Sequence, residues 1–239
     1  MADVDTDFNL KVVLVNFKQC LSEKEEVLMD PYLTGWKGLI KFLNNLGAVF
    51  AFISKDVLTK VQIMEKFRNS EQKENYFSLQ SMVKYEISNN LVDFQKRADH
   101  PDSGCRTILR LHRALHWLQL FLDGLRTSQE DSKTSSLCTD SYNIALATYH
   151  PWLIRKAVTV AFCTLPSRNA FLETMNVGTP EEAVEMLSDA MPFIGQGHPA
   201  RKCLKPDLNL GPPVSRPGSQ STENIRIYLN YVNSSKTNL

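Results

Sequence analysis

The segment Ser103–Thr127 has the residue spacing of one long helix with three chemically different faces. The first face is apolar, as expected for packing on a core, and comprises Ile108, Leu111, Leu115, Leu118, Leu122 and Leu125. The second face is polar, the expected solvent side, and comprises His112, His116, Gln119 and Asp123. The third face begins with cations and ends with apolar groups: Arg106, Arg110 and Arg113, then Trp117, Leu120, Phe121 and Gly124.

The third face favours a site with an anion at its mouth and an apolar interior, which is what a lipid with a phosphorylated head group needs. Arginine presents a planar fork that matches phosphate oxygens, and a bound phosphate would compensate cations held near an apolar wall. The alternative is structural, because arginines at a crowded helix end can also extend their charged tips to water. Periodicity alone leaves both interpretations open.

Composition narrows the class of protein. The chain has 239 residues, enough for one domain of up to about 200 residues or two small ones. Lys plus Arg is 27 and Asp plus Glu is 26, so no basic excess indicates nucleic acid. Five scattered cysteines without a Cys-x-x-Cys pair indicate reduced thiols in a cytosolic protein. Without a signal peptide or an apolar run near the roughly 20 residues of a membrane span, we expect only peripheral membrane contact.

Helical periodicity dominates the chain, and sustained two-residue alternation is missing, so the predicted fold class is all-α. The expected helices are Phe8–Leu21, Tyr32–Leu46, Ala48–Phe67, Asn75–Arg97, Ser103–Thr127, Ser135–Tyr149, Trp152–Thr164, Ser167–Met175 and Pro180–Ile194. Ser103 is the expected N-cap of its helix, and Pro151 suits the first position of another. From Gly195 to Leu239 the chain is rich in Gly and Pro, so we expect a domain over residues 8–194 and a mostly disordered tail over 195–239.

Three further groups are candidate site residues. Asp56 and Lys60 have i,i+4 spacing, which fits a solvated helix pair worth about 0.3–0.5 kcal/mol or a clamp on a polar head group. His150, just before Pro151, is either a loop residue or a ligand. An aromatic and two cations at one helix start are typical of a membrane interface, but also of ordinary surfaces; they are Trp152, Arg155 and Lys156.

Enzyme motifs are lacking. His112 and His116 have the spacing of two zinc ligands, but Arg113 stands where a zinc protease needs Glu and no third ligand is visible, so we favour solvent-facing histidines over a metal site. The sequence has no Gly-x-Ser-x-Gly elbow, Walker loop or dinucleotide fingerprint. We therefore expect a protein that is not an enzyme and has neither a metal nor a cofactor.

Four segments together resemble the glycolipid transfer protein superfamily over Phe8–Ile194: FNLKVVLVNFKQCL, AFISKDV, SGCRTILRLHRALHWLQLFL and YHPWLIRKAVTVAFCTLP. Glycolipid-specific members carry Trp where this chain has Arg110, and Asn where it has Lys60. Both departures replace sugar recognition with phosphate recognition. Family members continue their last helix into a Tyr-containing C-terminus, whereas the resemblance here stops near Ile194.

The resemblance implies a two-layer helical sandwich of about eight helices that encloses a lipid-chain cavity and transfers ceramide 1-phosphate between membranes. It assigns Asp56 to the sphingoid amide, and Lys60, Arg106 and Arg110 to the phosphate. It assigns His150 to the head group, Arg97 to the mouth of the site, and Trp152 to the membrane, with Arg155 and Lys156 beside it. It also implies a cytosolic monomer that associates peripherally with Golgi, endosomal, plasma and nuclear membranes. A helical scaffold for an acidic partner and a lipid hydrolase remain the alternatives.

Overall fold

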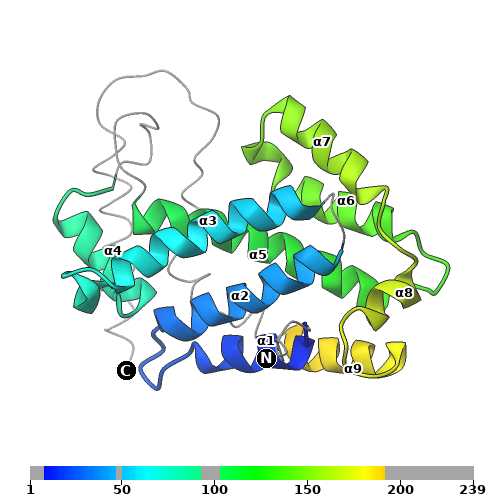
Figure 1. The fold of residues 1–239 in the computed structure, drawn as a ribbon, viewed down its shortest axis with the longest axis horizontal. Coiled ribbons are helices and arrows are strands. Elements are labelled where there is room, and N and C mark those ends of the chain that lie inside the picture. Colours follow the sequence, from blue (N-terminus) through cyan, green and yellow to red (C-terminus); the bar gives the residue numbers. More distant parts are fainter. Residues whose placement is uncertain (1–7, 47–49, 93–102, 192–239) are drawn as a thin grey trace, which may run out of the picture.

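A computed structural model describes residues 8–46, 50–92 and 103–191, and this part of the chain forms nine α-helices (Figure 1). The helices are α1 (Leu10–Gln19), α2 (Met29–Asn45), α3 (Ala51–Arg68), α4 (Leu79–Ser88), α5 (Gly104–Thr127), α6 (Thr134–Ala145), α7 (Trp152–Phe162), α8 (Arg168–Glu173) and α9 (Pro180–Met191). Two short 3-10 turns, η2 (Lys73–Tyr76) and η3 (Ala147–Tyr149), accompany them. The all-α prediction is confirmed; the predicted boundary at Gly195 lies outside the described residues.

Helix α5 is the centre of the packing. It contacts α3, α4, α6 and α9, while α1 packs on α2 and α2 packs on α3. Figure 1 shows α2 and α3 side by side, with α5 running behind them and α6 and α7 stacked at one end. Aromatic rings join the elements through the core: Phe171 of α8 meets Phe42 of α2 and Phe121 of α5 edge-on, with centroid distances of 5.5 and 5.1 Å.

The prediction that the polar face of α5 lies in solvent is wrong. From Ser103 to Arg126, each side chain is buried or half-buried, and this includes His112, His116, Gln119 and Asp123. Two contacts within the helix involve these polar groups: His116 Nδ1 lies 3.3 Å from Gln119 Oε1, and Arg126 donates to Asp123 at 2.8 Å. A central helix is covered on several sides, and periodicity cannot reveal how many neighbours it has.

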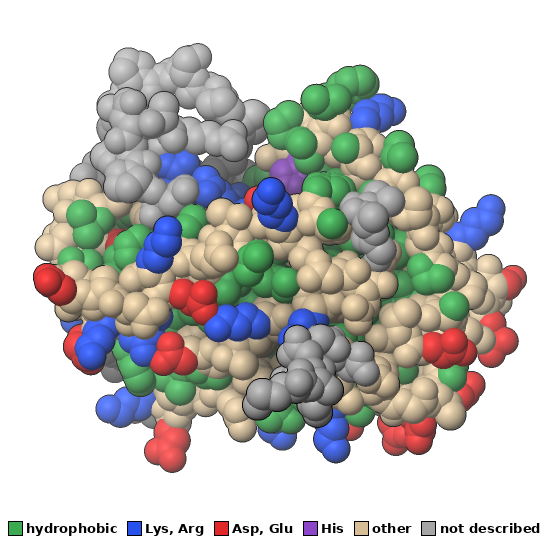
Figure 2. All heavy atoms as spheres, viewed as in Figure 1, with side chains coloured by type: hydrophobic (Ala, Val, Ile, Leu, Met, Phe, Trp, Pro, Cys, Tyr) green, Lys and Arg blue, Asp and Glu red, His purple; other side chains and the backbone are tan. Residues whose placement is uncertain are grey.

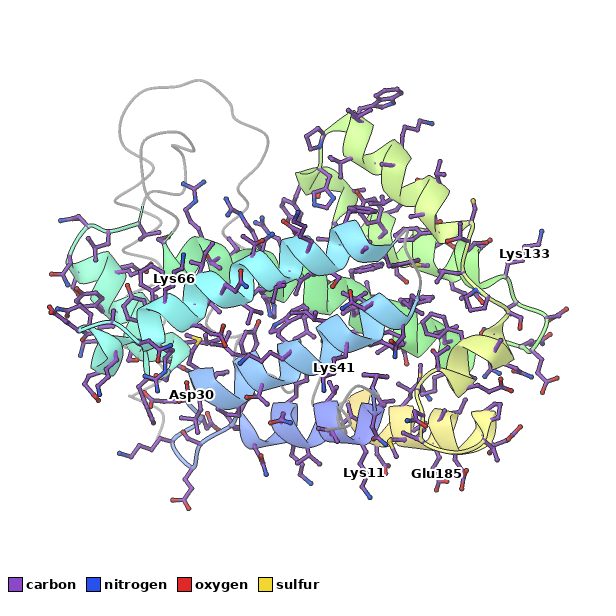
Figure 3. The ribbon with its side chains drawn as sticks, in the orientation of Figure 1. Lys11, Asp30, Lys41, Lys66, Lys133 and Glu185 are labelled. Atoms are coloured by element: carbon purple, nitrogen blue, oxygen red, sulfur yellow. The ribbon has the colours of Figure 1, made fainter. Side chains whose placement is uncertain are left out.

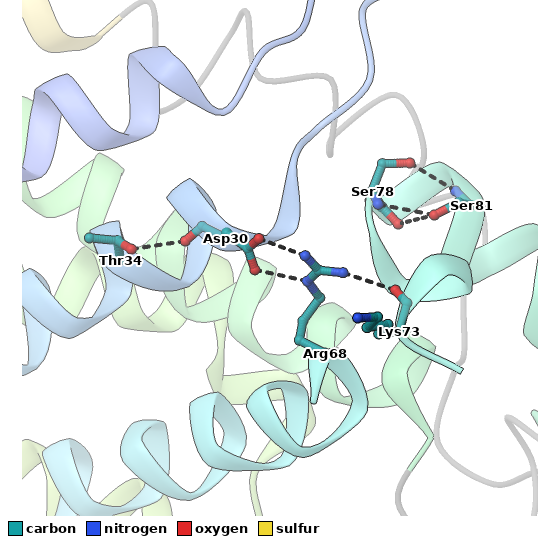
Figure 4. Close-up of polar contacts among 6 residues, drawn as sticks. All are labelled: Asp30, Thr34, Arg68, Lys73, Ser78 and Ser81. Atoms are coloured by element: carbon teal, nitrogen blue, oxygen red, sulfur yellow. Dashed lines mark hydrogen bonds and ion pairs between the residues drawn. The ribbon is translucent and has the colours of Figure 1, made fainter. Parts of the chain in front are cut away.

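The predicted helix Asn75–Arg97 is also wrong in extent. The chain turns at Phe77 and Ser78 because its backbone pairs with the segment before α2: Leu79 N–H donates to Val27 O at 2.9 Å, and Met29 N–H to Phe77 O at 3.0 Å. Ser78 then caps α4 through a reciprocal pair of bonds with Ser81, each 3.0 Å long (Figure 4). Helix α4 ends at Ser88, and Arg97 lies outside the described residues.

An ion pair ties α2 to the end of α3 (Figure 4). The Arg68 guanidinium donates to both oxygens of Asp30, at 2.8 and 2.6 Å, and to the carbonyl of Lys73 at 2.9 Å. The hydrogen bond from Arg68 lowers the pKa of Asp30. Because the Asp30 side chain is 65% exposed, water screens this pair, and we expect it to fix geometry more than it adds stability.

Many charged side chains lie on the described surface. Exposed charges such as Lys11, Lys66, Lys133 and Glu185 point away from the helices (Figure 3). In the described ranges, no helix is both long and apolar enough to cross a membrane. The cysteines there are free thiols: Cys20, Cys105 and Cys138 are buried and Cys163 is exposed.

Candidate head-group site

A buried carboxylate holds the N-terminus of α5. Glu86 of α4 is 1% exposed and accepts the N–H groups of Gly104 at 2.6 Å and Cys105 at 2.9 Å, and the Tyr76 hydroxyl at 3.1 Å. Ser103 caps the same turn, as predicted, and accepts the Arg106 N–H at 3.2 Å. These bonds satisfy backbone donors that a helix start leaves open, and a negative charge is favourable at that end of the helix dipole. The first arginine of the cationic face therefore stands on a fixed turn.

Gly104 lets side chains of α4 approach the start of α5 closely. A Cβ at this position would lie 2.6 Å from Met82 Sδ and 2.9 Å from the Glu86 Oε1 atom. A side chain here would have to displace the ends of the Met82 and Glu86 side chains, and moving Glu86 would disturb the carboxylate that caps α5. The other end of α5 is held as well: Arg168 of α8 is 8% exposed, and its Nε donates to the Leu125 carbonyl at 2.8 Å. A cation is the favourable charge at that end of the helix.

Asp56 and Lys60 form the predicted pair on α3, next to α5. Lys60 Nζ lies 2.5 Å from Asp56 Oδ1, and the Lys60 side chain is only 15% exposed, whereas that of Asp56 is 69% exposed. Because the carboxylate is exposed, water screens this pair much as it screens Arg68–Asp30, but the Lys60 side chain itself is largely covered by the protein. An ammonium group and a carboxylate are thus presented together at one position on the edge of the interior.

His150 joins this pair from a distant part of the chain. It follows η3 and is half-buried, and its Nδ1 lies 2.7 Å from the Tyr142 hydroxyl of α6. Burial lowers the pKa of His150, the charge of Asp56 opposes that change, and the charge of Lys60 adds to it. His150 therefore lies close enough to be affected by the charges of Asp56 and Lys60, although about ninety positions of sequence separate them.

The cationic face of α5 extends the site. Arg106 and Arg110 are both half-buried. Arg113 lies over the ring of Tyr149, with its Cζ 3.6 Å from the ring centroid. Burial is the main cause that lowers the pKa of Arg113, and the like charge of Arg110 contributes, so the two guanidinium groups are neighbours. Figure 2 shows basic side chains and a histidine beside exposed apolar side chains on one face of the molecule.

Helix α7 presents an apolar surface to solvent near His150. Its exposed apolar side chains are Trp152 (63%), Leu153 (69%), Ile154 (40%) and Val160 (68%). Arg155 and Lys156 are exposed on the same helix. Below this surface, Trp117 of α5 stacks on Phe162 of α7 with a centroid distance of 5.7 Å, so the apolar end of the cationic face reaches the interior beneath α7.

Sequence reasoning missed three side chains of this region: Glu86, Tyr142 and Tyr149. The two tyrosines hold His150 and Arg113, and Glu86 holds the turn that carries Arg106. Tyr149 directly precedes His150, which is the one sequence signal that points to it. Of the predicted residues, Arg97 cannot be placed, since it falls outside the described ranges.

The chemistry of these residues suits an anion. Lys60 pairs with Asp56 on α3, His150 is affected by both of their charges, and α3 packs against the helix that carries Arg106 and Arg110. Burial raises the pKa of the Cys105 thiol well above its ordinary value, so this thiol near Arg106 stays protonated and is a poor nucleophile. Where the structure describes the chain, no three His, Cys, Asp or Glu residues are arranged to hold a metal ion.

Known proteins share both the sequence and the fold. The sequence profile of the glycolipid transfer protein (GLTP) family matches residues 27–177. The ceramide-1-phosphate transfer protein of Homo sapiens is 68% identical over 194 residues, which is 81% of this chain and 91% of that protein. The protein of the same name from Danio rerio is 53% identical over 88% of this chain and 98% of its own length. A crystal structure of the human protein in complex with 12:0 ceramide-1-phosphate superposes with a TM-score of 0.80 at 64% identity, covering 85% of this chain and 98% of that one.

Proposed function

The chain belongs to the glycolipid transfer protein family, and from this premise we propose that it binds ceramide 1-phosphate and carries it between membranes without catalysing a reaction. The Lys60–Asp56 pair on α3, which packs against the arginine-bearing helix α5, is the observation that carries the proposal, because it supplies a cation for a phosphate and an acceptor for an amide N–H. The human relative, crystallised with 12:0 ceramide-1-phosphate, supports the choice of lipid. The lipid-binding domain would span residues 8–194.

Each head-group residue has a role that its chemistry suits. Lys60, Arg106 and Arg110 would bind the phosphate, the lysine as a point charge and the arginines through their planar forks. Asp56, which can only accept when ionised, would take the sphingoid amide N–H and the hydroxyl. We propose Arg97 as an additional cation at the mouth of the site.

The energetics suit a carrier. Moving a 16-carbon chain from a membrane into water costs about 0.8 kcal/mol of free energy per CH₂. Roughly 12 kcal/mol therefore opposes its spontaneous escape. Inside a protein with an apolar interior, the chain has nearly the same free energy as it has in the membrane. In this proposal the chains extend from the head group past Trp117 into the interior, and the lipid moves down its own gradient. Transfer then needs no nucleotide site.

Membrane surfaces would be the second partner, contacted by α7. We propose that Trp152 inserts at the bilayer surface while Arg155 and Lys156 meet anionic lipid heads, because an amphipathic ring and basic neighbours are typical of that depth. The chain would act as a monomer in the cytosol, with transient contact to Golgi, endosomal, plasma and nuclear membranes.

Replacing Trp152 with alanine is expected to weaken partitioning onto vesicles, since it removes the largest exposed apolar group of α7. Affinity for ceramide 1-phosphate dispersed in detergent should stay the same, because the side chain points to solvent. Vesicle co-sedimentation and a detergent binding assay measure the two quantities. Val12→Ala, at an exposed apolar position on α1, is the matched control. Unchanged partitioning would remove Trp152 from the docking surface.

Lipid selectivity tests the proposed function directly. In vesicle transfer assays, ceramide 1-phosphate should move and galactosylceramide should not. A neutral sugar would leave desolvated cations uncompensated, at a cost of about 1–3 kcal/mol, which corresponds to roughly five- to 150-fold weaker binding. Equal transfer of the two lipids would contradict the proposal.

Native mass spectrometry after exposure to ceramide 1-phosphate separates the alternatives. An intact lipid retained by the protein supports transfer. Release of a dephosphorylated or deacylated product would instead identify a hydrolase. Failure to retain any lipid would favour the helical scaffold, whose cations would then bind an acidic partner.

A further inference from the structure

The hydroxyl of Tyr142 is buried against His150. The Tyr142 side chain is 2% exposed, and its ring meets that of Phe162 edge-on, with centroids 5.7 Å apart. Its oxygen lies 2.7 Å from Nδ1 of His150, a short and therefore well-formed hydrogen bond. The bond can run in either direction, and the direction decides which nitrogen of His150 carries the proton.

The direction follows from the need of the buried tyrosine O–H for an acceptor. If Nδ1 carried the proton, the tyrosine oxygen would accept it, and the tyrosine's own proton would need a second acceptor. Among the residues that the structure describes, the Tyr142 hydroxyl bonds to His150 and to no further group. A buried donor without an acceptor costs about 1–3 kcal/mol. The favourable arrangement is the one in which the tyrosine O–H donates to Nδ1 and the ring proton sits on Nε2.

The surrounding charges agree with a neutral ring. Burial and the charge of Lys60 lower the pKa of His150, against the opposing effect of Asp56. Burial raises the pKa of Tyr142, against the effect of Arg155, so this hydroxyl keeps its proton. A neutral imidazole has one donor and one acceptor, and the donor tautomer at Nε2 is set by the bond at Nδ1.

We infer that Tyr142 is a positioning residue: its hydroxyl fixes neutral His150 as the Nε2–H tautomer, so that His150 presents a donor and not an acceptor to the lipid. The inference rests on the proposed function. In a ceramide 1-phosphate head, the phosphate is matched by cations and the amide N–H and hydroxyl by Asp56. The amide carbonyl remains, and because it only accepts, it requires a donor.

The test is NMR of the ¹⁵N-labelled histidine rings in the lipid-free protein at neutral pH. His150 is assigned by loss of its signals in His150→Gln. In the wild type, Nδ1 should give a pyridine-type resonance and Nε2 a pyrrole-type one. In Tyr142→Phe, which keeps the ring but loses the hydroxyl, the two tautomers should mix. Ceramide 1-phosphate binding should then weaken roughly two- to tenfold, the range for one hydrogen bond.

Tyr76→Phe is the matched control, because it removes another buried tyrosine hydroxyl, the one bonded to Glu86. It should leave the His150 resonances unchanged. A proton on Nδ1 in the wild type would overturn the inference, and so would an unchanged tautomer in Tyr142→Phe. The wild-type spectrum decides even if the variant fails to fold. Because these spectra need no lipid, absence of ceramide 1-phosphate binding by the wild type would count against the proposed function alone.

Discussion

Replacing Arg106 or Arg110 with leucine is expected to reduce ceramide 1-phosphate transfer by more than about tenfold, while circular dichroism remains helical. A charged hydrogen bond to phosphate contributes about 1.5–3 kcal/mol, and 1.4 kcal/mol is already a factor of ten in affinity. Leucine is a good helix former, and the apolar stripe that packs α5 on the core is untouched. Transfer between vesicles and far-ultraviolet circular dichroism measure the two properties in one preparation.

Arg126→Leu is the matched control for this experiment. Arg126 lies in the last turn of the same helix, where it pairs with Asp123 at 2.8 Å, far along α5 from the head-group residues. Its replacement should leave transfer close to the wild-type rate. Loss of helicity in both the Arg106 and Arg110 variants would show instead that these arginines are structural.

Glu86→Ala is expected to destabilise the domain strongly, although it removes no apolar core side chain. It removes the acceptor of two backbone N–H groups and of the Tyr76 hydroxyl, all of them in a buried position. Orphaning these donors should lower the free energy of unfolding by about 3–5 kcal/mol. In a domain of this size that is a fall of roughly 10 °C in the midpoint of thermal unfolding.

Calorimetry or urea denaturation measures the loss. Glu185→Ala, an exposed carboxylate on α9, should change stability by less than about 0.5 kcal/mol. Glu86→Gln should fall between the two, because its amide keeps one acceptor oxygen but turns a donor toward another donor. A Glu86→Ala protein as stable as the Glu185→Ala control would show that water replaces the lost carboxylate.

Local sequence patterns predicted where most of the described helices lie. The start of α5 follows from Ser103, a capping side chain directly before a helical apolar period, and the structure has the cap bond that this predicts. The break at Phe77 and Ser78 was missed for the opposite reason. It depends on backbone pairing with residues about fifty positions away, which the local pattern does not contain.

The site was predictable in part. Arg106 and Arg110 stand out because cations on an otherwise apolar stripe violate the expected pattern. Asp56 and Lys60 look like a surface pair until α5 is known to pack beside α3, and it was family resemblance that assigned them a role. Tyr142 and Glu86 carried no signal at all: a tyrosine at a core position and a glutamate in a polar helix are both unremarkable until the fold shows what they touch.

The capping of α5 at both ends, by Glu86 and by Arg168, has a consequence for the working cycle of a carrier. Such a protein arrives at membranes alternately with and without a bound lipid. If the helix that bears the proposed phosphate ligands had to become ordered again at every visit, each loading would lose free energy to that ordering. Because residues of the domain itself hold both ends of α5, we expect this ordering to be completed once, during folding. We therefore expect the slow step at a membrane to be the movement of the lipid chains between the bilayer and the protein interior. Ordering of the helix that carries the arginines should not limit the rate.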